Sequence, residues 1–247
     1  MNKRLLLSLS GGADSVVLLH MAVDRGYEYI HTISFDYGQR HKRELDCIQK
    51  QFDAVNDKHS VKLFNTIIDA NFLKQICPTS SLTNTDIENP NISKIAGDAQ
   101  PVSYVPFRNQ MFNTIACAYA ESNGISNVWY GAAQVDSLAG YHDGSREHID
   151  AFNQLISLNR EHRITLSAPL LTMSKADIIT EGVRLGVNFA DTWTCYSNRE
   201  DGLADATTPS SSMRLAGFMQ AGYVDPIKYV QQEALDVIYR QKGCEEI

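Results

Sequence analysis

The chain contains 247 residues, of which 43% are hydrophobic and 21% charged, a composition that excludes a disordered or low-complexity protein and predicts one large α/β domain. Its 29 Asp and Glu residues outnumber its 22 Lys and Arg residues, and the net charge of −7 argues against a protein that coats a nucleic-acid backbone. No apolar stretch approaches the roughly 20 residues that span a bilayer, so we expect no membrane-spanning segment.

The first half of the chain alternates apolar, β-prone runs with helix-like segments. Residues 5–9 predict a buried strand that enters a tight turn at Ser10, Gly11 and Gly12. Further strands are predicted over 29–35, 61–67 and 127–130, and helices over 15–23, 42–56 and 109–123. This alternation indicates a parallel sheet with helices on its faces. The Pro-, Asn- and Ser-rich segment 78–102 predicts a long loop, more typical of a lid than of a linker.

The second half is less regular. We predict a helix over 148–158, a last strand over 164–171 and a helix over 174–185 that is capped by Ser174 and followed by Gly186. Beyond Trp193 the pattern degrades and then recovers as helices over 213–221 and 227–242. The expected fold is an α/β doubly wound, mostly parallel sheet over residues 1–190, with a C-terminal helical extension over 191–247 packed on it, effectively one domain.

Two features favour a cytoplasmic protein. The apolar run after Lys3 and Arg4 breaks after Leu9, too early for the roughly 7–15-residue core of a signal peptide. The cysteines are odd in number and show no close pair, which fits reduced thiols. They are Cys47, Cys77, Cys117, Cys195 and Cys244.

The strongest chemical signal lies at the junction of the first predicted strand and helix. It consists of Ser8, Leu9, Ser10, Gly11, Gly12, Ala13, Asp14 and Ser15. Glycines let the backbone turn sharply and bring its N–H groups against phosphate oxygens, and the helix N-terminus adds favourable partial charge. Ser10 and Ser15 can donate hydrogen bonds to the same oxygens, and Asp14 is suited to hold Mg²⁺. A structural turn with a capping Ser or Asp is the alternative interpretation.

This stretch has neither the Gly-Lys-Ser/Thr ending of a Walker A loop nor the G-x-G-x-x-G of NAD-binding folds. It resembles the PP-loop, S-G-G-x-D-S, of the ATP pyrophosphatases. The resemblance implies an enzyme that splits ATP into AMP and pyrophosphate, adenylates a carboxyl or carbonyl oxygen, and lets a nitrogen or sulfur nucleophile displace AMP. A non-catalytic nucleotide-binding module is the alternative from another class. The net charge and the lack of paired catalytic cysteines disfavour an RNA-thiolating enzyme.

Further segments resemble one PP-loop family, the 7-cyano-7-deazaguanine synthases known as QueC. Their order and spacing follow that family over roughly residues 4–226. The segments are S-F-D-Y-G-Q-R-H at 34–41, Y-V-P-F-R-N at 104–109, A-Q-V-D at 133–136, G-Y-H-D at 140–143, P-L at 169–170, S-K-A-D at 174–177 and T-W-T-C-Y at 192–196.

The resemblance and the chemistry of the side chains together nominate a site. Arg108 is suited to clamp a phosphate, and Lys175 lies at a predicted helix start, where the helix dipole disfavours a cation unless a ligand phosphate is its partner. We expect catalytic roles for Asp14, Arg108 and Lys175. Ser34 and Phe35 are expected to join the loop in binding ATP. Substrate binding is expected from Tyr37, Gln39, His41, Tyr104, Asp136, Tyr141 and Asp143.

Several of these residues also have a purely structural interpretation. Arg108 would otherwise be an exposed loop arginine, and Lys175 an ordinary first-turn lysine. Tyr37, Gln39 and His41 equally suit a solvated turn, and Asp143 suits a Gly-flanked turn. Asp136 is the stronger of the two aspartates, because a carboxylate accepts hydrogen bonds from the N–H groups of a purine-like ring.

QueC proteins resemble one another in a C-terminal zinc site of four closely spaced cysteines, and here the sequence departs from the family. Cys195 takes the first position. If Arg214, Gly217 and Phe218 anchor the comparison, the other three positions fall on Asp205, Thr208 and Ser211. One thiolate, one carboxylate and two hydroxyls make a poor zinc site. We therefore expect no structural zinc, and a loop over 205–212 held by capping and side-chain hydrogen bonds.

The resemblance implies an ATP-dependent, Mg²⁺-requiring ligase that converts 7-carboxy-7-deazaguanine and ammonia into 7-cyano-7-deazaguanine (preQ0) in queuosine biosynthesis, through acyl-adenylate and amide intermediates. It also implies a homodimer that does not contact nucleic acid directly. The altered zinc positions keep an alternative open. This is a diverged QueC-like enzyme of an anti-phage or phage system, which stops at the amide or transfers the acyl group to an amine on a partner protein.

Overall fold

The computed structural model describes residues 3–37, 42–84, 86–87, 102–134, 144–159, 163–195, 199 and 201–247. Its centre is one sheet in the order β3-β2-β1-β4-β5, in which every pairing is parallel. The strands are β1 (Arg4–Ser8), β2 (Tyr29–Asp36), β3 (Lys62–Asp69), β4 (Asn127–Trp129) and β5 (Thr165–Ser167). The predicted α/β class and parallel sheet are therefore confirmed.

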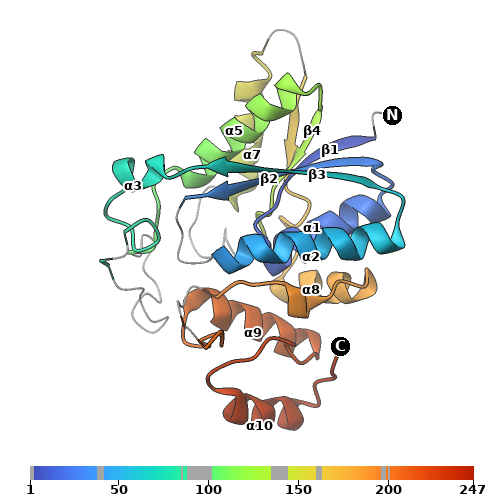
Figure 1. Cartoon of the computed structure of the whole chain (residues 1–247), viewed down its shortest axis with the longest axis vertical. Helices are drawn as coiled ribbons and strands as arrows, with labels where there is room; N and C mark the ends of the chain where they lie inside the picture. Colours follow the sequence, from blue (N-terminus) through green and yellow to red (C-terminus); the bar gives the residue numbers. More distant parts are fainter. Residues whose placement is uncertain are drawn as a thin grey trace.

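Helices cover both faces of this sheet (Figure 1). Those described are α1 (Ala13–Asp24), α2 (Lys42–Lys58), α3 (Phe72–Ile76), α5 (Arg108–Ser122), α7 (Arg146–Ile156), α8 (Lys175–Arg184), α9 (Pro209–Ala221) and α10 (Gln232–Lys242), together with a short 3₁₀ turn, η2 (Phe189–Asp191). Helices α1 and α2 lie on one face, and α5 and α7 on the other. Within the described residues, no helix is long and apolar enough to cross a membrane.

Strand β1 shows why its sequence suits a sheet covered on both sides. Leu5 and Leu7 belong to the core under α1 and α2, whereas Leu6 between them belongs to the core under α5. All three side chains are fully buried. Successive residues of a strand point to opposite faces, so an unbroken apolar run is what a doubly covered parallel strand requires.

The strand order creates a switch point beside β1. This strand pairs with β2 on one side and with β4 on the other, so the chain winds outward from β1 in both directions. In open α/β sheets, ligands bind outside the carboxyl ends of the strands at such a point. The loop that follows Ser8 leaves β1 at this position.

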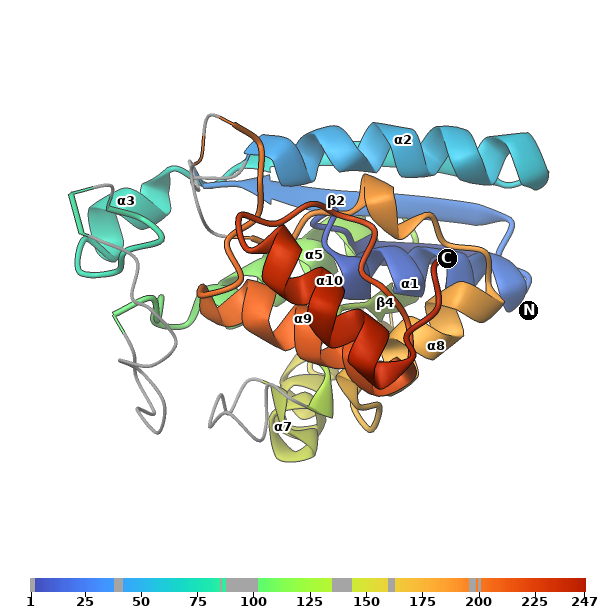
Figure 2. The same cartoon turned by 90° about the horizontal axis from the view of Figure 1, so that it is seen from below.

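The C-terminal extension stacks beyond α8. Helix α9 packs on α8, and α10 lies outside α9 (Figures 1 and 2). Trp193, Leu215, Tyr229 and Leu235 contribute to a separate apolar core in this region.

Two predicted helix boundaries in the extension are wrong. Helix α9 begins at Pro209 rather than at 213, because proline fits the first helical position. Helix α10 begins at Gln232 rather than at 227. The backbone before it is extended: Ala204 N–H donates to Lys228 O at 2.9 Å, and Val230 N–H donates to Ala204 O at 2.9 Å. Of the predicted long loop over 78–102, residues 85 and 88–101 lie outside the described residues.

Candidate active site

The loop between β1 and α1 is held in shape by its own residues. Gly11 adopts φ 87°, a left-handed conformation that favours glycine. Ser10 N–H donates to Ser15 Oγ at 3.2 Å, and that hydroxyl donates to Gly12 O at 3.0 Å. The Ser15 hydroxyl, expected to meet phosphate, thus closes the loop from inside α1.

The start of α1 is open to an anion. Gly12 is the N-cap, and within the described part of the chain no side chain caps this helix. The first N–H groups of a helix have no intrahelical partner, and they attract negative charge. A Cβ at Gly12 would lie 3.3 Å from Ser10 Oγ and 3.6 Å from Trp193 O, so a larger residue would crowd the loop. The geometry suits a phosphate cradle formed by backbone N–H groups.

Lys175 and Asp14, 161 residues apart, meet beside this cradle. Lys175 Nζ donates to Asp14 Oδ2 at 2.5 Å. Both side chains are largely shielded, with exposed fractions of 16% and 27%. Lys175 is the first residue of α8, as predicted. The helix start is fixed by Ser174 and Asp177, each of which accepts a hydrogen bond from the other's backbone N–H. The Ser174 hydroxyl and the Ser174 backbone N–H both donate to the Asp177 carboxylate and hold its pKa below the ordinary value.

Asp14 also fits the magnesium ion that ATP chemistry requires. Its second carboxylate oxygen, Oδ1, is buried and has no hydrogen-bond partner among the residues that the structure describes. Mg²⁺ prefers oxygen ligands and is commonly held by one or two carboxylates together with substrate phosphates. Among the described residues, no group of three His, Cys, Asp or Glu side chains is arranged to hold a metal without such help.

The predicted residues at the end of β2 take part in packing. Ser34 Oγ donates to Leu9 O at 2.7 Å and thereby ties β2 to the loop. The ring of Phe35 stacks on Phe112 of α5, and the buried ring of Tyr37 tilts against the same Phe112. A solvated turn is therefore the wrong interpretation for Tyr37. The Phe35 ring is committed to the core, which leaves its backbone as the part suited to meet a nucleotide.

Arg108 begins α5 at the same edge of the sheet as the loop (Figure 1). Its Nε donates to Asn109 Oδ1 at 3.3 Å, and its side chain is partly exposed. The residue before it, Phe107, is 67% exposed and adopts φ 55°, a conformation that a bulky side chain rarely takes. Such strain is often found at binding sites and is a feature that the sequence did not indicate.

The remaining predicted substrate residues are only partly covered by the structure. Tyr104 is partly exposed and lies four residues before α5. Gln39, His41, Asp136, Tyr141 and Asp143 lie outside the described residues.

The four positions that the family resemblance assigned to zinc cysteines, Cys195, Asp205, Thr208 and Ser211, do converge. Asp205 N–H donates to Cys195 Sγ at 3.3 Å, and Thr208 Oγ1 lies 3.8 Å from the same sulfur. Thr208 Oγ1 donates to Ser211 Oγ at 2.8 Å. The Asp205 carboxylate instead accepts from Thr207 and Gln231. This donor set, one thiol with hydroxyls and backbone groups, does not fit zinc.

A buried ion pair in the extension was missed by sequence reasoning. Arg214, 2% exposed, donates from Nε and Nη2 to both carboxylate oxygens of Asp225, at 2.7 and 2.9 Å. It also donates to Thr192 Oγ1 at 2.7 Å and to Phe189 O at 3.1 Å. Asp225 further accepts from the Tyr229 hydroxyl, whose pKa is raised by burial and by that carboxylate.

This ion pair is connected to the loop. Trp193, the residue after Thr192, donates its N–H to Gly11 O at 3.1 Å. The extension therefore contacts the loop between β1 and α1 directly. Arg214 and Asp225 are 11 residues apart in sequence, and no local pattern in that sequence signals their pairing.

Comparisons with known proteins agree with the motifs. The profile of a family described as queuosine biosynthesis protein QueC matches residues 4–222. The 7-cyano-7-deazaguanine synthase of Thermoplasma volcanium is 37% identical over 233 residues, which cover 93% of this chain and 92% of that protein. The synthase of the same name from Clostridium kluyveri is 37% identical, over 92% of this chain and 98% of that protein. Among solved structures, NMN synthetase from Francisella tularensis has 15% identity and a TM-score of 0.49, over 97% of this chain and 83% of that chain.

Proposed function

Because this chain belongs to the QueC family of queuosine biosynthesis proteins, we propose that it uses ATP to convert 7-carboxy-7-deazaguanine and ammonia into 7-cyano-7-deazaguanine. The observation that carries the proposal is the pairing of Lys175 with Asp14 beside the uncapped start of α1. A helix start, a lysine and a carboxylate together can hold a triphosphate with its magnesium ion.

The proposed reaction has two activation steps. A carboxylate oxygen of the substrate attacks the α-phosphorus of ATP, which forms an acyl adenylate and releases pyrophosphate. Ammonia then attacks the acyl carbon, AMP leaves, and the amide forms with loss of a proton. The amide oxygen then attacks the α-phosphorus of a second ATP, which releases a second pyrophosphate and, with loss of one amide proton, gives an imidate adenylate. Departure of AMP and loss of the remaining N–H proton give the nitrile.

The chain's own groups position the nucleotide and neutralise charge. The N–H groups at the start of α1 bind the phosphates that leave as pyrophosphate. Lys175 exchanges its contact with Asp14 for one with these oxygens, and Arg108 approaches them from α5. When bound, Mg²⁺ would be held by Asp14 and would further neutralise the phosphate charge. Aligning the reactants and stabilising charge account for the acceleration, so no covalent enzyme nucleophile is needed.

Substrate recognition is assigned to the residues nominated by the family resemblance. Asp136 and Asp143 would accept hydrogen bonds from ring N–H groups of the deazaguanine. Tyr37, Gln39, His41, Tyr104 and Tyr141 would complete substrate recognition.

The test is to incubate the protein with ATP, Mg²⁺, the deazaguanine acid and ammonium, and to identify the products by mass spectrometry. We expect the nitrile, AMP and pyrophosphate, and their loss in Lys175→Ala. Absence of pyrophosphate would overturn the proposal and indicate a binding module.

The substituted zinc positions favour one second candidate, a diverged enzyme that stops at the amide or acylates a protein amine. Release of amide alone, or a mass increase on a partner protein in place of nitrile, would identify it. This outcome would support the adenylation step and show that the nitrile is not the product.

A further inference from the structure

The stem of Lys175 lies against the backbone of α9. Gly217, in the middle of that helix, is buried, and a Cβ built on it would overlap Lys175 Cγ. The same atom would lie 3.0 Å from Lys175 Cβ and 3.4 Å from its carbonyl carbon. These distances are at or below the limit of ordinary carbon–carbon contacts. A glycine at 217 therefore allows the helix to form a wall directly against the lysine side chain.

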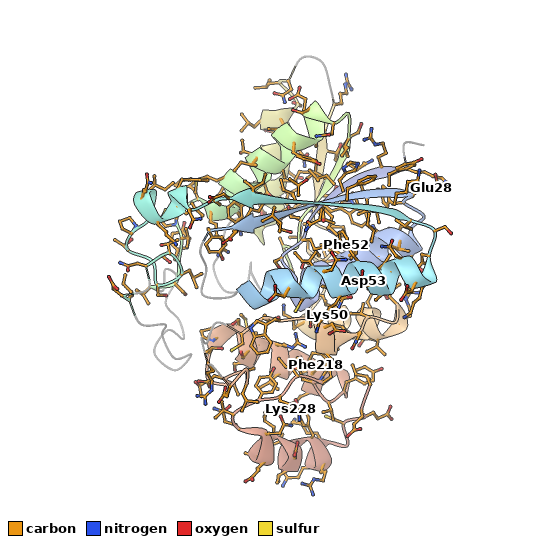
Figure 3. The ribbon with its side chains drawn as sticks, viewed as in Figure 1. Glu28, Lys50, Phe52, Asp53, Phe218 and Lys228 are labelled. Atoms are coloured by element: carbon orange, nitrogen blue, oxygen red, sulfur yellow. The ribbon has the colours of Figure 1, made fainter. Side chains whose placement is uncertain are left out.

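Anchors on both sides of Gly217 hold this wall in place. Arg214, one turn earlier, is fixed by Asp225, Thr192 and Phe189. Phe218, the next residue on α9 (Figure 3), is fully buried and packs edge-to-face against Phe189 at 5.2 Å. A wall that is fixed in this way removes rotamers that a lysine would otherwise explore.

We propose that Gly217 is a positioning residue: by letting α9 pack on the stem of Lys175, it aims the ammonium group at Asp14 and at the phosphate that replaces it. This inference rests on the proposed function for the role of the ammonium group. It extends that function because the C-terminal extension then positions a side chain of the active site.

Another glycine of the same packing layer provides a matched control. Gly182 lies on α8, and a Cβ there would overlap Phe189 Cζ and lie 2.8 Å from Val17 Cγ2. Its surroundings are as tight as those of Gly217, but its neighbours are core side chains. Gly182→Ala therefore introduces a comparable overlap that falls on Val17 and on Phe189, one of the anchors of α9. It measures the cost of disturbing this packing layer without a direct contact with Lys175.

The first measurement compares turnover in Gly217→Ala and Gly182→Ala at matched folded fraction. We expect Gly217→Ala to lose about tenfold or more in kcat beyond Gly182→Ala, because the lysine is displaced. In a Lys175→Ala background, adding Gly217→Ala should change any residual turnover by less than about twofold, since both changes act through one group. Equal losses in the two glycine variants would reduce Gly217 to a packing residue.

The second measurement does not depend on turnover. Brief acetylation with an activated acetate ester, followed by peptide mass spectrometry, reports how well the Lys175 amine is held against Asp14. We expect several-fold faster modification of Lys175 in Gly217→Ala and a clearly smaller increase in Gly182→Ala. If wild type makes no nitrile but this contrast holds, the reaction is wrong and the positioning stands. If nitrile forms but the contrast is absent, the positioning is wrong.

A third comparison covers the case in which Gly217→Ala does not fold. Lys175→Gly removes both the Cγ and the Cβ atoms that the new methyl group would meet, so the double variant with Gly217→Ala should fold where Gly217→Ala alone fails. Circular dichroism and melting curves show whether the second substitution restores folding. A double variant that also fails to fold contradicts the proposed contact.

Discussion

The loop between β1 and α1 and the C-terminal extension contribute to one candidate site in different ways. The loop supplies its groups from eight consecutive residues, and its shape is fixed by glycines and by hydrogen bonds between Ser10, Gly12 and Ser15. The extension supplies support from distant residues, through the Arg214–Asp225 pair and the wall at Gly217. A binding motif can thus be local while its geometry depends on parts of the chain that carry no motif.

The largest expected effect concerns the loop's chemistry. Asp14→Asn preserves the size of the side chain but removes the charge that Lys175 and the magnesium ion need. We expect kcat to fall by about 10²–10³, the usual cost of removing one group that stabilises transition-state charge. Pyrophosphate release measures the loss, and a melting temperature close to that of wild type shows that folding is intact. A fall of less than about tenfold would argue that the carboxylate is not part of the catalytic site.

The next effect concerns the stability of the extension. Arg214→Ala leaves the buried Asp225 charge unpaired, so we expect the free energy of unfolding to drop by about 3–5 kcal/mol. Urea denaturation measures the drop. Arg184→Ala is the control, because it breaks exposed ion pairs with Asp24 and Glu181 and should cost less than about 1 kcal/mol. Similar costs for both variants would mean that Arg214 does not hold the extension as described.

A third experiment tests whether the C-terminal extension holds the zinc ion that the family resemblance implies. Purified protein should contain well below about one zinc per chain, and a strong chelator should leave its melting temperature unchanged, since metal would otherwise contribute folding energy. Asp205, Thr208 and Ser211 replaced together by cysteine should bind zinc and gain chelator sensitivity. Stoichiometric zinc in the unmodified protein would contradict the hydrogen-bonded cluster around Cys195.

The smallest expected effect is a pH dependence of stability caused by His20 of α1. Its Nε2 lies 3.3 Å from Oε1 of Gln51 on α2. Burial lowers the pKa of His20 from its ordinary value of 6.5, although the bond to Gln51 opposes this. As pH falls, the unfolded chain therefore protonates His20 before the folded chain does. The stability that neutral His20 permits above pH 6.5 is lost as pH falls toward the folded-state pKa of His20.

His20→Gln should flatten that pH dependence. His31, whose pKa burial also lowers, would leave a residual slope. Denaturation curves between pH 5 and pH 8 measure the slope. An unchanged slope in His20→Gln would show that His20 does not contribute.

Much of the sheet was predictable because its signals are local. The apolar run of β1, the β-rich residues of β2 and the capping Ser174 each mark an element within a few positions. The helix over 227–242 was predicted too long because the pairing of Tyr229 with Ala204 is a tertiary contact. Such contacts override the local preference of the residues before α10.

In the candidate site, too, local motifs predicted some residues, whereas the roles of others depend on tertiary contacts. The loop and the start of α8 were predicted from motifs, and the structure brings Asp14 and Lys175 together. The role of Gly217 was not predictable from the sequence, because a buried glycine gains its meaning from the side chain opposite it. Arg214 appeared in the sequence only as a spacing marker, yet it is among the largest fully buried side chains.

The most direct test of the central claim follows the oxygen of the substrate carboxylate. Supplied as ¹⁸O-labelled acid with ATP, Mg²⁺ and ammonium, it should transfer label to the phosphate of AMP, because the carboxylate oxygen attacks the α-phosphorus. The transfer should be lost in Lys175→Ala. Label found in inorganic phosphate with ADP as the other product, or absent from AMP while nitrile forms, would contradict adenylation at this loop.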